Sequence, residues 1–367
     1  MEKGYLVLEN GEIFEGNRIG SNKDTVCEVV FNTSMTGYLE IFTDPSYAGQ
    51  GVTLTYPLIG NYGIITNDVE SRKMWIKAVF IHELAELESN FRSETNLNDY
   101  LKNNDIPGLK NVNTRKLTKL LRDHGTMRGK LVSDISNLQD IIKEIKQYTF
   151  PNVVGEVSNK HIREFGEGRN RIALIDFGCK ENIIKSLVNR DCTVKVFPQD
   201  ISAETILEGN FDGILLSNGP GDPEDCKIAI DNIKKLYKSD IPIMGICLGH
   251  QLMALATGAS TAKLKYGHRG PNHPVKELKT GRICITSQNH GYYVKEDSIN
   301  KDIAEVSYVN VNDGTIEGLN YKDKNIFTVQ FHPEACPGPQ DCAYLFDEFI
   351  AKIEDRKENK KCQRTNK

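Results

Sequence analysis

The feature that most constrains this chain is residues 241–251, which read IPIMGICLGHQ. An apolar run enters a Gly-x-Cys-x-Gly turn, and a helical pattern follows. A strand that turns this sharply into a helix leaves no room for neighbouring side chains, so Gly245 and Gly249 suit the turn and Cys247 is held at its tip. The unpaired N–H groups and macrodipole of a helix N-terminus favour a thiolate there. A lone cysteine is more often a core residue, but the two glycines and the polar pair that follows favour Cys247 as a nucleophile.

Strands and helices alternate regularly around this turn. Buried strands are expected at residues 172–176, 193–197, 213–217 and 241–246, and helices at residues 182–189, 203–207 and 227–237. Such alternation predicts an α/β fold with a doubly wound, mostly parallel sheet and helices on both faces. Ligands bind beyond the carboxyl ends of the strands in such sheets, and Cys247 lies at one of these ends.

The N-terminal part of the chain lacks this regular alternation of strands and helices. A length of 367 residues also suggests two domains. Asn10-Gly11 between two apolar runs predicts a β-hairpin, and a third strand is expected at residues 26–31. Residues 33–62 are expected to form a long loop with a functional role. Helical patterns occupy residues 96–103 and 114–122, and another begins at Ser136 with a capping-box pattern, Ser136-x-x-Gln139. We therefore expect a smaller α/β domain at residues 1–150, a linker at 151–170, the main domain at 171–355 and a basic, disordered tail at 356–367.

Composition excludes several classes of function. The net charge of −4 gives no electrostatic basis for binding nucleic acid or a membrane surface, and no apolar run has the roughly 18 residues of a membrane span. Neither partner is expected, and no signal peptide is recognised. The nine scattered cysteines contain no Cys-x-x-Cys, which argues against disulfides or a zinc ribbon and favours a cytoplasmic location.

Two further motifs belong to the same expected sheet edge. The turn SNGPGDP follows the strand at residues 213–217, and its glycines let main-chain N–H groups approach a ligand; we pair the N–H groups of Gly219 and Leu248 as oxyanion donors. A last strand at residues 327–331 leads to His332-Pro333-Glu334, a base with an acid placed to orient it. The histidines at 268, 273 and 290 fit no standard metal site, so no metal is expected on this chain.

These motifs together resemble the class I (triad) glutamine amidotransferases. The N-terminal part narrows the resemblance, because it is similar to the small subunit of carbamoyl-phosphate synthase over nearly the whole chain. That likeness rests on VFNTSMTGY at residues 30–38, TDPSY at 43–47, YPLIGNYG at 56–63 and GHRGPNHP at 267–274. The resemblance implies a glutaminase that sends ammonia to a large synthetase subunit, which uses bicarbonate, Mg²⁺ and two ATP to make carbamoyl phosphate for arginine or pyrimidine synthesis.

The resemblance also implies roles for individual residues. Cys247 would be the nucleophile, His332 the general base and acid, and Glu334 its partner. L-Glutamine would be bound by Ser46, Gly219, Gly221, Leu248, Gln251, Asn289, Gly291 and Tyr292. Because Ser46 lies within residues 1–150, both domains are expected to contribute to the pocket, and the N-terminal domain is also expected to dock the partner. Tyr292 stands where the family often has Phe, and Asn113 replaces a common Asp while leaving a helix N-cap intact.

Alternatives remain open at this point. The glutaminase subunit of another class I amidotransferase complex would keep the triad but would not account for residues 1–150. A cysteine peptidase would need a cleft for extended chains, and an inactive interaction subunit would have lost part of the triad. No cofactor is expected on this chain, because the Gly-x-x-x-x-Gly-Lys-[Ser/Thr] loop for ATP is missing from the sequence. Heterodimers with the large subunit, and higher-order assemblies of them, are the implied quaternary states.

Overall fold

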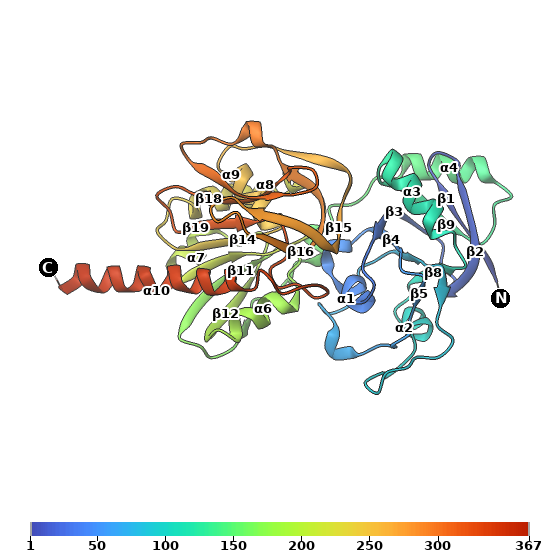
Figure 1. The fold of residues 1–367 in the computed structure, drawn as a ribbon, viewed down its shortest axis with the longest axis horizontal. Coiled ribbons are helices and arrows are strands. Elements are labelled where there is room, and N and C mark those ends of the chain that lie inside the picture. The colour runs from blue at the N-terminus through green and yellow to red at the C-terminus, as the bar shows by residue number, and fades with distance from the viewer. Residues whose placement is uncertain (1, 366–367) are drawn as a thin grey trace. The chain divides into compact units, whose positions relative to one another are not determined.

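The computed structural model describes residues 2–365 and divides into two compact units (Figure 1). The first unit comprises Met1–Val153 together with Lys265–Gly270, and the second comprises Val154–Leu264 and Pro271–Lys367. Each unit has its own apolar interior.

The first unit is built on a closed barrel with the strand order β1-β2-β8-β6-β4-β3-β9. The strands are β1 (Lys3–Leu8), β2 (Ile13–Gly20), β3 (Thr25–Asn32), β4 (Gln50–Leu54), β6 (Ala78–Phe80), β8 (Pro107–Lys110) and β9 (Met127–Val132). The predicted hairpin is confirmed, with Leu6 opposite Phe14, and so is the third strand. Closure leaves no barrel strand with an unpaired edge.

Four helices accompany the barrel: α1 (Tyr38–Thr43), α2 (Leu97–Asn103), α3 (Thr114–His124) and α4 (Leu138–Gln147). The helix predicted after Ser136 is confirmed as α4, and its Ile145 and neighbouring apolar residues pack against Val7 and Val132. The capping box is wrong. Asn137 occupies the N-cap, and the Ser136 hydroxyl bonds the Asp134 carboxylate instead.

The expectation of a long loop at residues 33–62 is also wrong. This region contains α1, a 3₁₀ turn (Pro45–Tyr47), the barrel strand β4 and β5 (Leu58–Ile59), which pairs with β7 (Glu83–Leu84). Strand β4 pairs in parallel with both β3 and β6, so its place is decided by distant neighbours rather than by local pattern. Gly51 explains the weak strand signal, because a Cβ there would lie 2.4 Å from the Cys27 Sγ.

The second unit contains one ten-stranded sheet with the order β10-β12-β11-β13-β14-β19-β18-β17-β15-β16. Strands β12, β11, β13, β14 and β19 are parallel, as predicted, and antiparallel strands flank them. The strands are β10 (Arg163–Phe165), β11 (Asn170–Asp176), β12 (Cys192–Pro198), β13 (Gly213–Leu216), β14 (Ile243–Ile246), β15 (Thr261–Glu277), β16 (Ile283–Val294), β17 (Ala304–Asn310), β18 (Ile316–Tyr321) and β19 (Ile326–Val329).

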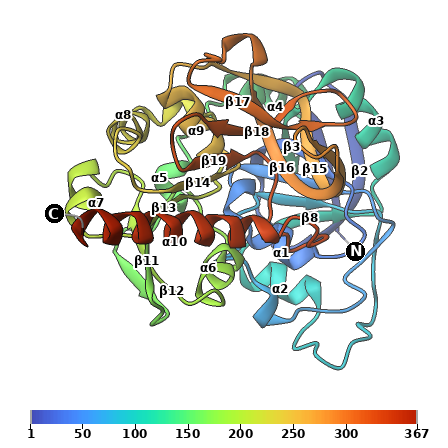
Figure 2. The same cartoon turned by 60° about the vertical axis from the view of Figure 1, so that its left-hand side comes forward.

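Helices cover both faces of this sheet, so the predicted doubly wound α/β class is confirmed. One apolar cluster joins the sheet to α7 (Ala203–Glu208), α8 (Lys227–Leu236) and α9 (Leu248–Ala256). A second cluster joins the other face to α6 (Glu181–Val188) and α10 (Tyr344–Thr365), which Figure 2 shows running across the strands. Gly213 lets α10 approach closely, because a Cβ there would lie 2.8 Å from the Phe349 ring.

Two predicted segments differ in the structure. The expected linker at 151–170 includes α5 (Val154–Val157) and the edge strand β10, which pairs with β12, so most of it belongs to the second unit. The expected disordered tail at 356–367 is helical through residue 365, as the end of α10; residues 366–367 lie outside the described residues. The linker strand takes its structure from pairing with β12, and the tail continues a helix whose earlier residues pack on the sheet.

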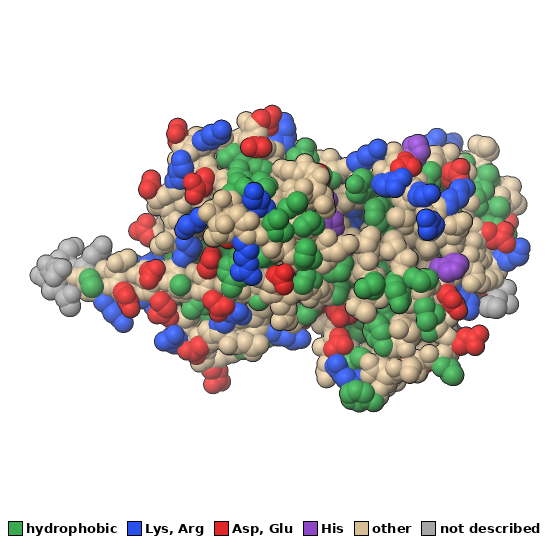
Figure 3. All heavy atoms as spheres, viewed as in Figure 1, with side chains coloured by type: hydrophobic (Ala, Val, Ile, Leu, Met, Phe, Trp, Pro, Cys, Tyr) green, Lys and Arg blue, Asp and Glu red, His purple; other side chains and the backbone are tan. Residues whose placement is uncertain are grey.

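No helix among the described residues is long and apolar enough to cross a membrane. Figure 3 shows Lys and Arg side chains interspersed with Asp and Glu on the visible face of each unit, in keeping with the net charge of −4.

We predict that Phe349→Ala destabilises the second unit through the cavity it leaves against β13. The side chain is fully buried, so the free energy of unfolding should fall by about 3–5 kcal/mol in urea titrations followed by circular dichroism. Asp355→Ala, on an exposed position of the same helix, should change it by less than about 0.5 kcal/mol. Equal effects of the two changes would contradict the packing of α10 on the sheet.

Candidate active site

Cys247 connects β14 to α9 in a backbone conformation that residues with a side chain rarely adopt. Its φ is 53° and its ψ is −104°, outside the main allowed regions, and such a conformation costs on the order of 1–3 kcal/mol. The Cys247 N–H donates to the carbonyl of Val329 at 2.8 Å, which anchors the turn to the neighbouring strand. The predicted sharp strand-to-helix turn is therefore confirmed, with the thiol at its tip.

The two glycines of the turn are explained by close contacts. A Cβ at Gly249 would lie 2.3 Å from the Leu216 carbonyl oxygen, and a Cβ at Gly245 would lie 2.8 Å from the Thr328 Cγ2. Neither gap admits a methyl group without moving a strand. Helix α9 is thereby held directly against the ends of β13 and β19.

His332 lies just beyond β19, and its backbone N–H donates to the Ser287 carbonyl at 2.9 Å. In its side chain, Nδ1 lies 2.6 Å from Glu334 Oε1, and Nε2 is buried without a hydrogen-bond partner among the described residues. Cys247, His332 and Glu334 are each at most 5% exposed, and the charge of Cys247 acts on His332, so the three predicted residues form one buried, electrostatically linked group.

The charges in this chain strongly perturb its titration. Burial lowers the pKa of His332, but the charges of Glu334 and Cys247 and the hydrogen bond to Glu334 outweigh burial and raise it to about 10. Burial raises the pKa of Glu334, but the charges of Lys180 and His332 outweigh burial and lower it to about 2. An imidazolium held by a carboxylate is therefore the favoured state near neutral pH, and it can deliver a proton.

Lys180 is a member of this charge cluster that sequence reasoning missed. It follows β11 at the N-cap of α6, is 3% exposed, and places Nζ 3.1 Å from Glu334 Oε1. Nζ also donates to the carbonyl of Ala335. A lysine just beyond a strand at the carboxyl edge of the sheet is the signal that could have identified it, because that edge carries the other site residues.

The turn after β13 lies against the start of α9. Ser217 accepts a hydrogen bond from the Gly249 N–H at 3.0 Å through its carbonyl. A Cβ at Gly219 would lie 2.3 Å from the Phe177 carbonyl oxygen and 2.8 Å from the Leu248 Cδ2, so only glycine fits at this position. Gly219 and Leu248, the two expected oxyanion donors, are thus neighbours, and Gly221 has a φ of +88° that favours glycine.

Strand β16 brings a further group of predicted residues to Cys247. The Asn289 carbonyl lies 3.8 Å from the Cys247 Sγ, and Gln251 Nε2 donates to the Tyr292 carbonyl at 2.8 Å. Gly291 lies between these two positions on the strand. Ser46 belongs to the first unit, where its N–H donates to Asp44 Oδ1, and its role in this site stays a prediction.

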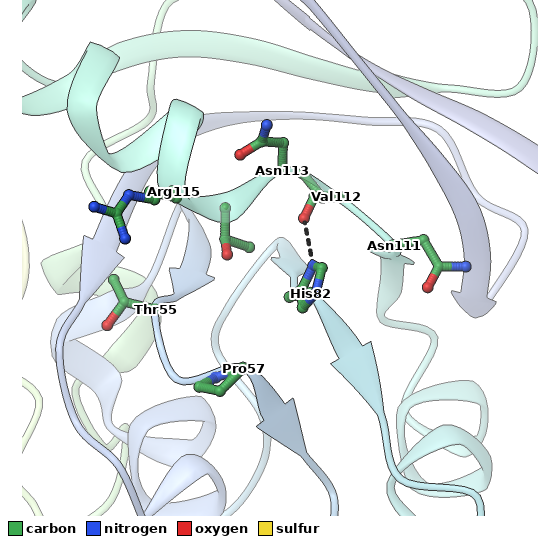
Figure 4. Close-up of a pocket in the computed structure, with 8 residues that line it drawn as sticks. Thr55, Pro57, His82, Asn111, Val112, Asn113 and Arg115 are labelled. Atoms are coloured by element: carbon green, nitrogen blue, oxygen red, sulfur yellow. Dashed lines mark hydrogen bonds between the residues drawn. The ribbon is translucent and has the colours of Figure 1, made fainter.

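The first unit has a separate pocket of about 400 Å³ where α3 begins (Figure 4). Asn113 caps this helix by accepting from the Lys116 N–H, as predicted, and the His82 ring lies 3.4 Å from the Val112 carbonyl. The pocket is lined by Thr55, Pro57, His82, Asn111, Val112, Asn113, Thr114 and Arg115. None of the predicted site residues lines this pocket.

We predict that Glu334→Gln destabilises the protein in a pH-dependent way. The raised pKa of His332 contributes stability that is present below pH 6.5 and lost as pH rises through about 10. The lowered pKa of Glu334 contributes stability that is present above pH 4.5 and lost as pH falls through about 2. The loss of unfolding free energy in urea titrations should therefore be greatest between pH 4.5 and 6.5 and shrink towards about pH 10. A pH-independent loss, or the same profile in the exposed control Glu305→Gln, would contradict the pair.

Comparisons with known proteins cover both units. Residues 173–352 match the family model of class-I glutamine amidotransferases, and residues 6–131 match that of the carbamoyl-phosphate synthase small chain, CPSase domain. The carbamoyl phosphate synthase small chain of Clostridium perfringens is 53% identical over 95% of this chain and 99% of that protein. The pyrimidine-specific small chain of Bacillus subtilis is 52% identical over 96% of both chains, and the small chain of Listeria monocytogenes is 49% identical over 98% of this chain and 99% of that protein. The chain therefore belongs to the carbamoyl-phosphate synthase small chain family.

Proposed function

We propose that this chain is the glutaminase subunit of a glutamine-hydrolysing carbamoyl-phosphate synthase, with Cys247, His332 and Glu334 as its catalytic residues. The observation that carries this assignment is the His332 ring, which hydrogen-bonds the Glu334 carboxylate through Nδ1 and whose pKa is raised by the charge of Cys247 inside the second unit. A nucleophile, a base and a group that orients the base are the three parts that this kind of catalysis requires.

The proposed reaction begins with attack of the Cys247 thiolate on the side-chain amide carbon of L-glutamine. The tetrahedral oxyanion accepts hydrogen bonds from the N–H groups of Gly219 and Leu248. The His332 imidazolium protonates the departing nitrogen, so ammonia leaves and a glutamyl thioester remains. His332, now neutral, takes a proton from water as the water attacks the thioester, and glutamate is released with the thiol side chain restored.

The glutamine pocket is proposed to include the residues that the family resemblance assigns. They are Ser46, Gly219, Gly221, Leu248, Gln251, Asn289, Gly291 and Tyr292. Support comes from the second unit, where the turn after β13, the start of α9 and the end of β16 lie next to one another. Backbone N–H and carbonyl groups dominate this set, which suits recognition of a small polar substrate.

The product ammonia is proposed to pass to a large subunit, which combines it with bicarbonate using two ATP and Mg²⁺. The small-chain relatives imply such a partner, and heterodimers and higher assemblies of them are the proposed quaternary states. A cytoplasmic location is also proposed; among the described residues none of the nine cysteines forms a disulfide, which suits a reducing compartment.

We predict that Cys247→Ser abolishes carbamoyl phosphate synthesis from glutamine, because the alcohol is a far weaker nucleophile than the thiolate. Synthesis from added ammonium by the variant with its large subunit should stay within about twofold of wild type, since a mutated glutaminase site leaves the ammonia-using site intact. The measurement is carbamoyl phosphate formation with each nitrogen source. Equal loss with both sources would contradict the division of labour, and Cys226→Ser, at another buried cysteine, serves as the matched control.

We also predict that the isolated chain is a slow glutaminase that its partner activates. Free hydrolysis would release ammonia uselessly, and a tenfold activation needs only about 1.4 kcal/mol of coupling, within the usual allosteric range. Glutamate release should be followed with the chain alone and then with large subunit, bicarbonate and ATP added in steps. A rate that stays constant across the series would show a constitutive glutaminase instead.

A further inference from the structure

The side-chain amide of Gln251 is held by two acceptors. Its Nε2 donates to the carbonyl of Tyr292 at 2.8 Å and to Gln330 Oε1 at 2.9 Å. A primary amide has two N–H groups, so both donors of Gln251 are engaged. Gln251 is 3% exposed and Gln330 is fully buried, so water does not compete for these bonds.

The orientation of both amides follows from the Tyr292 carbonyl. A carbonyl oxygen can only accept, so the Gln251 nitrogen must face it; the opposite orientation would bring two oxygens together. Because that nitrogen is a donor, Gln330 must in turn present its oxygen. Each reversed arrangement would create a repulsive pair, so the hydrogen bonds determine one orientation of the whole network.

The network leaves one unused group on each side chain. Among the described residues, none donates a hydrogen bond to Gln251 Oε1, and Gln330 Nε2 is buried without a partner. A buried, unsatisfied donor costs on the order of 1–3 kcal/mol, and such groups in native proteins often mark a functional constraint. The cost of leaving Gln330 Nε2 without a partner is explained if Gln330 Oε1 is needed to hold the Gln251 amide.

We propose that Gln330 is a positioning residue that locks the Gln251 amide with Oε1 as an acceptor for the α-ammonium group of the substrate. This inference rests on the proposed function. Gln251 is four residues after Cys247, one turn along the same face of α9. Glutamine has two hydrogen-bond donors, its side-chain amide and its α-ammonium group. The side-chain amide reacts at Cys247, so the α-ammonium group is the donor that reaches Gln251. Gln330 therefore acts on selectivity for α-amino substrates without touching them.

The test compares Gln330→Met, which has similar length but no amide oxygen, with Gln330→Glu, which keeps an acceptor in either protonation state. With the large subunit present, Gln330→Met should raise KM for L-glutamine about tenfold, with kcat within about threefold, as expected for losing about 1.4 kcal/mol of binding. Hydrolysis of glutaramate, which lacks the α-amino group, should be unchanged. Gln330→Glu should restore most of the affinity for glutamine.

A double-mutant cycle separates positioning from a general structural effect. Gln251→Leu removes the acceptor, so adding Gln330→Met to it should raise KM no further. Phe327→Leu, a buried change in the same strand, should lower stability without changing the preference for glutamine over glutaramate. Additive effects, or equal losses with the two substrates, would overturn the inference while leaving glutaminase activity in place. Failure of the wild-type complex to hydrolyse glutamine would overturn both the proposed function and the inference.

Discussion

The strained backbone at Cys247, with its positive φ of 53°, is the constraint on which the site depends. It is kept in place by three adjacent parallel strands, where Leu216 pairs with Gly245 and Gly245 pairs with Thr328. That register brings the carboxyl ends of β13, β14 and β19 together, and the chain leaves each strand towards a different part of the site. The strain at Cys247, on the order of 1–3 kcal/mol, is tolerated because the sheet on both sides over-determines the turn. Geometry at the thiol is thus a consequence of strand pairing.

The buried charges behind the thiol depend on one another in the same way. Glu334 lies between the His332 ring and the Lys180 ammonium, at 2.6 and 3.1 Å. Removing any charged group from such a place is costly, since each buried ion is compensated only by its partners. The charge of Lys180 lowers the pKa of Glu334, in addition to the effect of His332. The carboxylate can therefore stabilise the imidazolium at the step that needs it without being protonated itself.

Sequence reasoning succeeded where local chemistry decides the outcome and failed where distant packing does. The turn at Cys247 and the strand–helix alternation have short-range signatures, namely flanking glycines and apolar periodicity. Strand β4 has none, because Gly51 and its neighbours are placed by pairing with β3 and β6. The helical residues 356–365 continue α10 from a buried segment that starts with apolar contacts to the sheet. Lys180 and Gln330 were missed because their significance lies in partners far away along the chain.

Backbone carbonyls supply the fixed references for these side-chain networks. Ala335 accepts from Lys180, Tyr292 accepts from Gln251, and Val329 accepts from the Cys247 N–H. A carbonyl oxygen can only accept a hydrogen bond, whereas a side-chain amide or imidazole can present either a donor or an acceptor. A side chain that bonds a carbonyl must therefore turn a donor towards it. The Tyr292 and Val329 carbonyls lie on β16 and β19, so the pairing of these strands fixes them, and the Ala335 carbonyl lies in the segment that follows β19. The sheet therefore determines which groups at the site donate and which accept hydrogen bonds. Their orientation is fixed before a substrate binds.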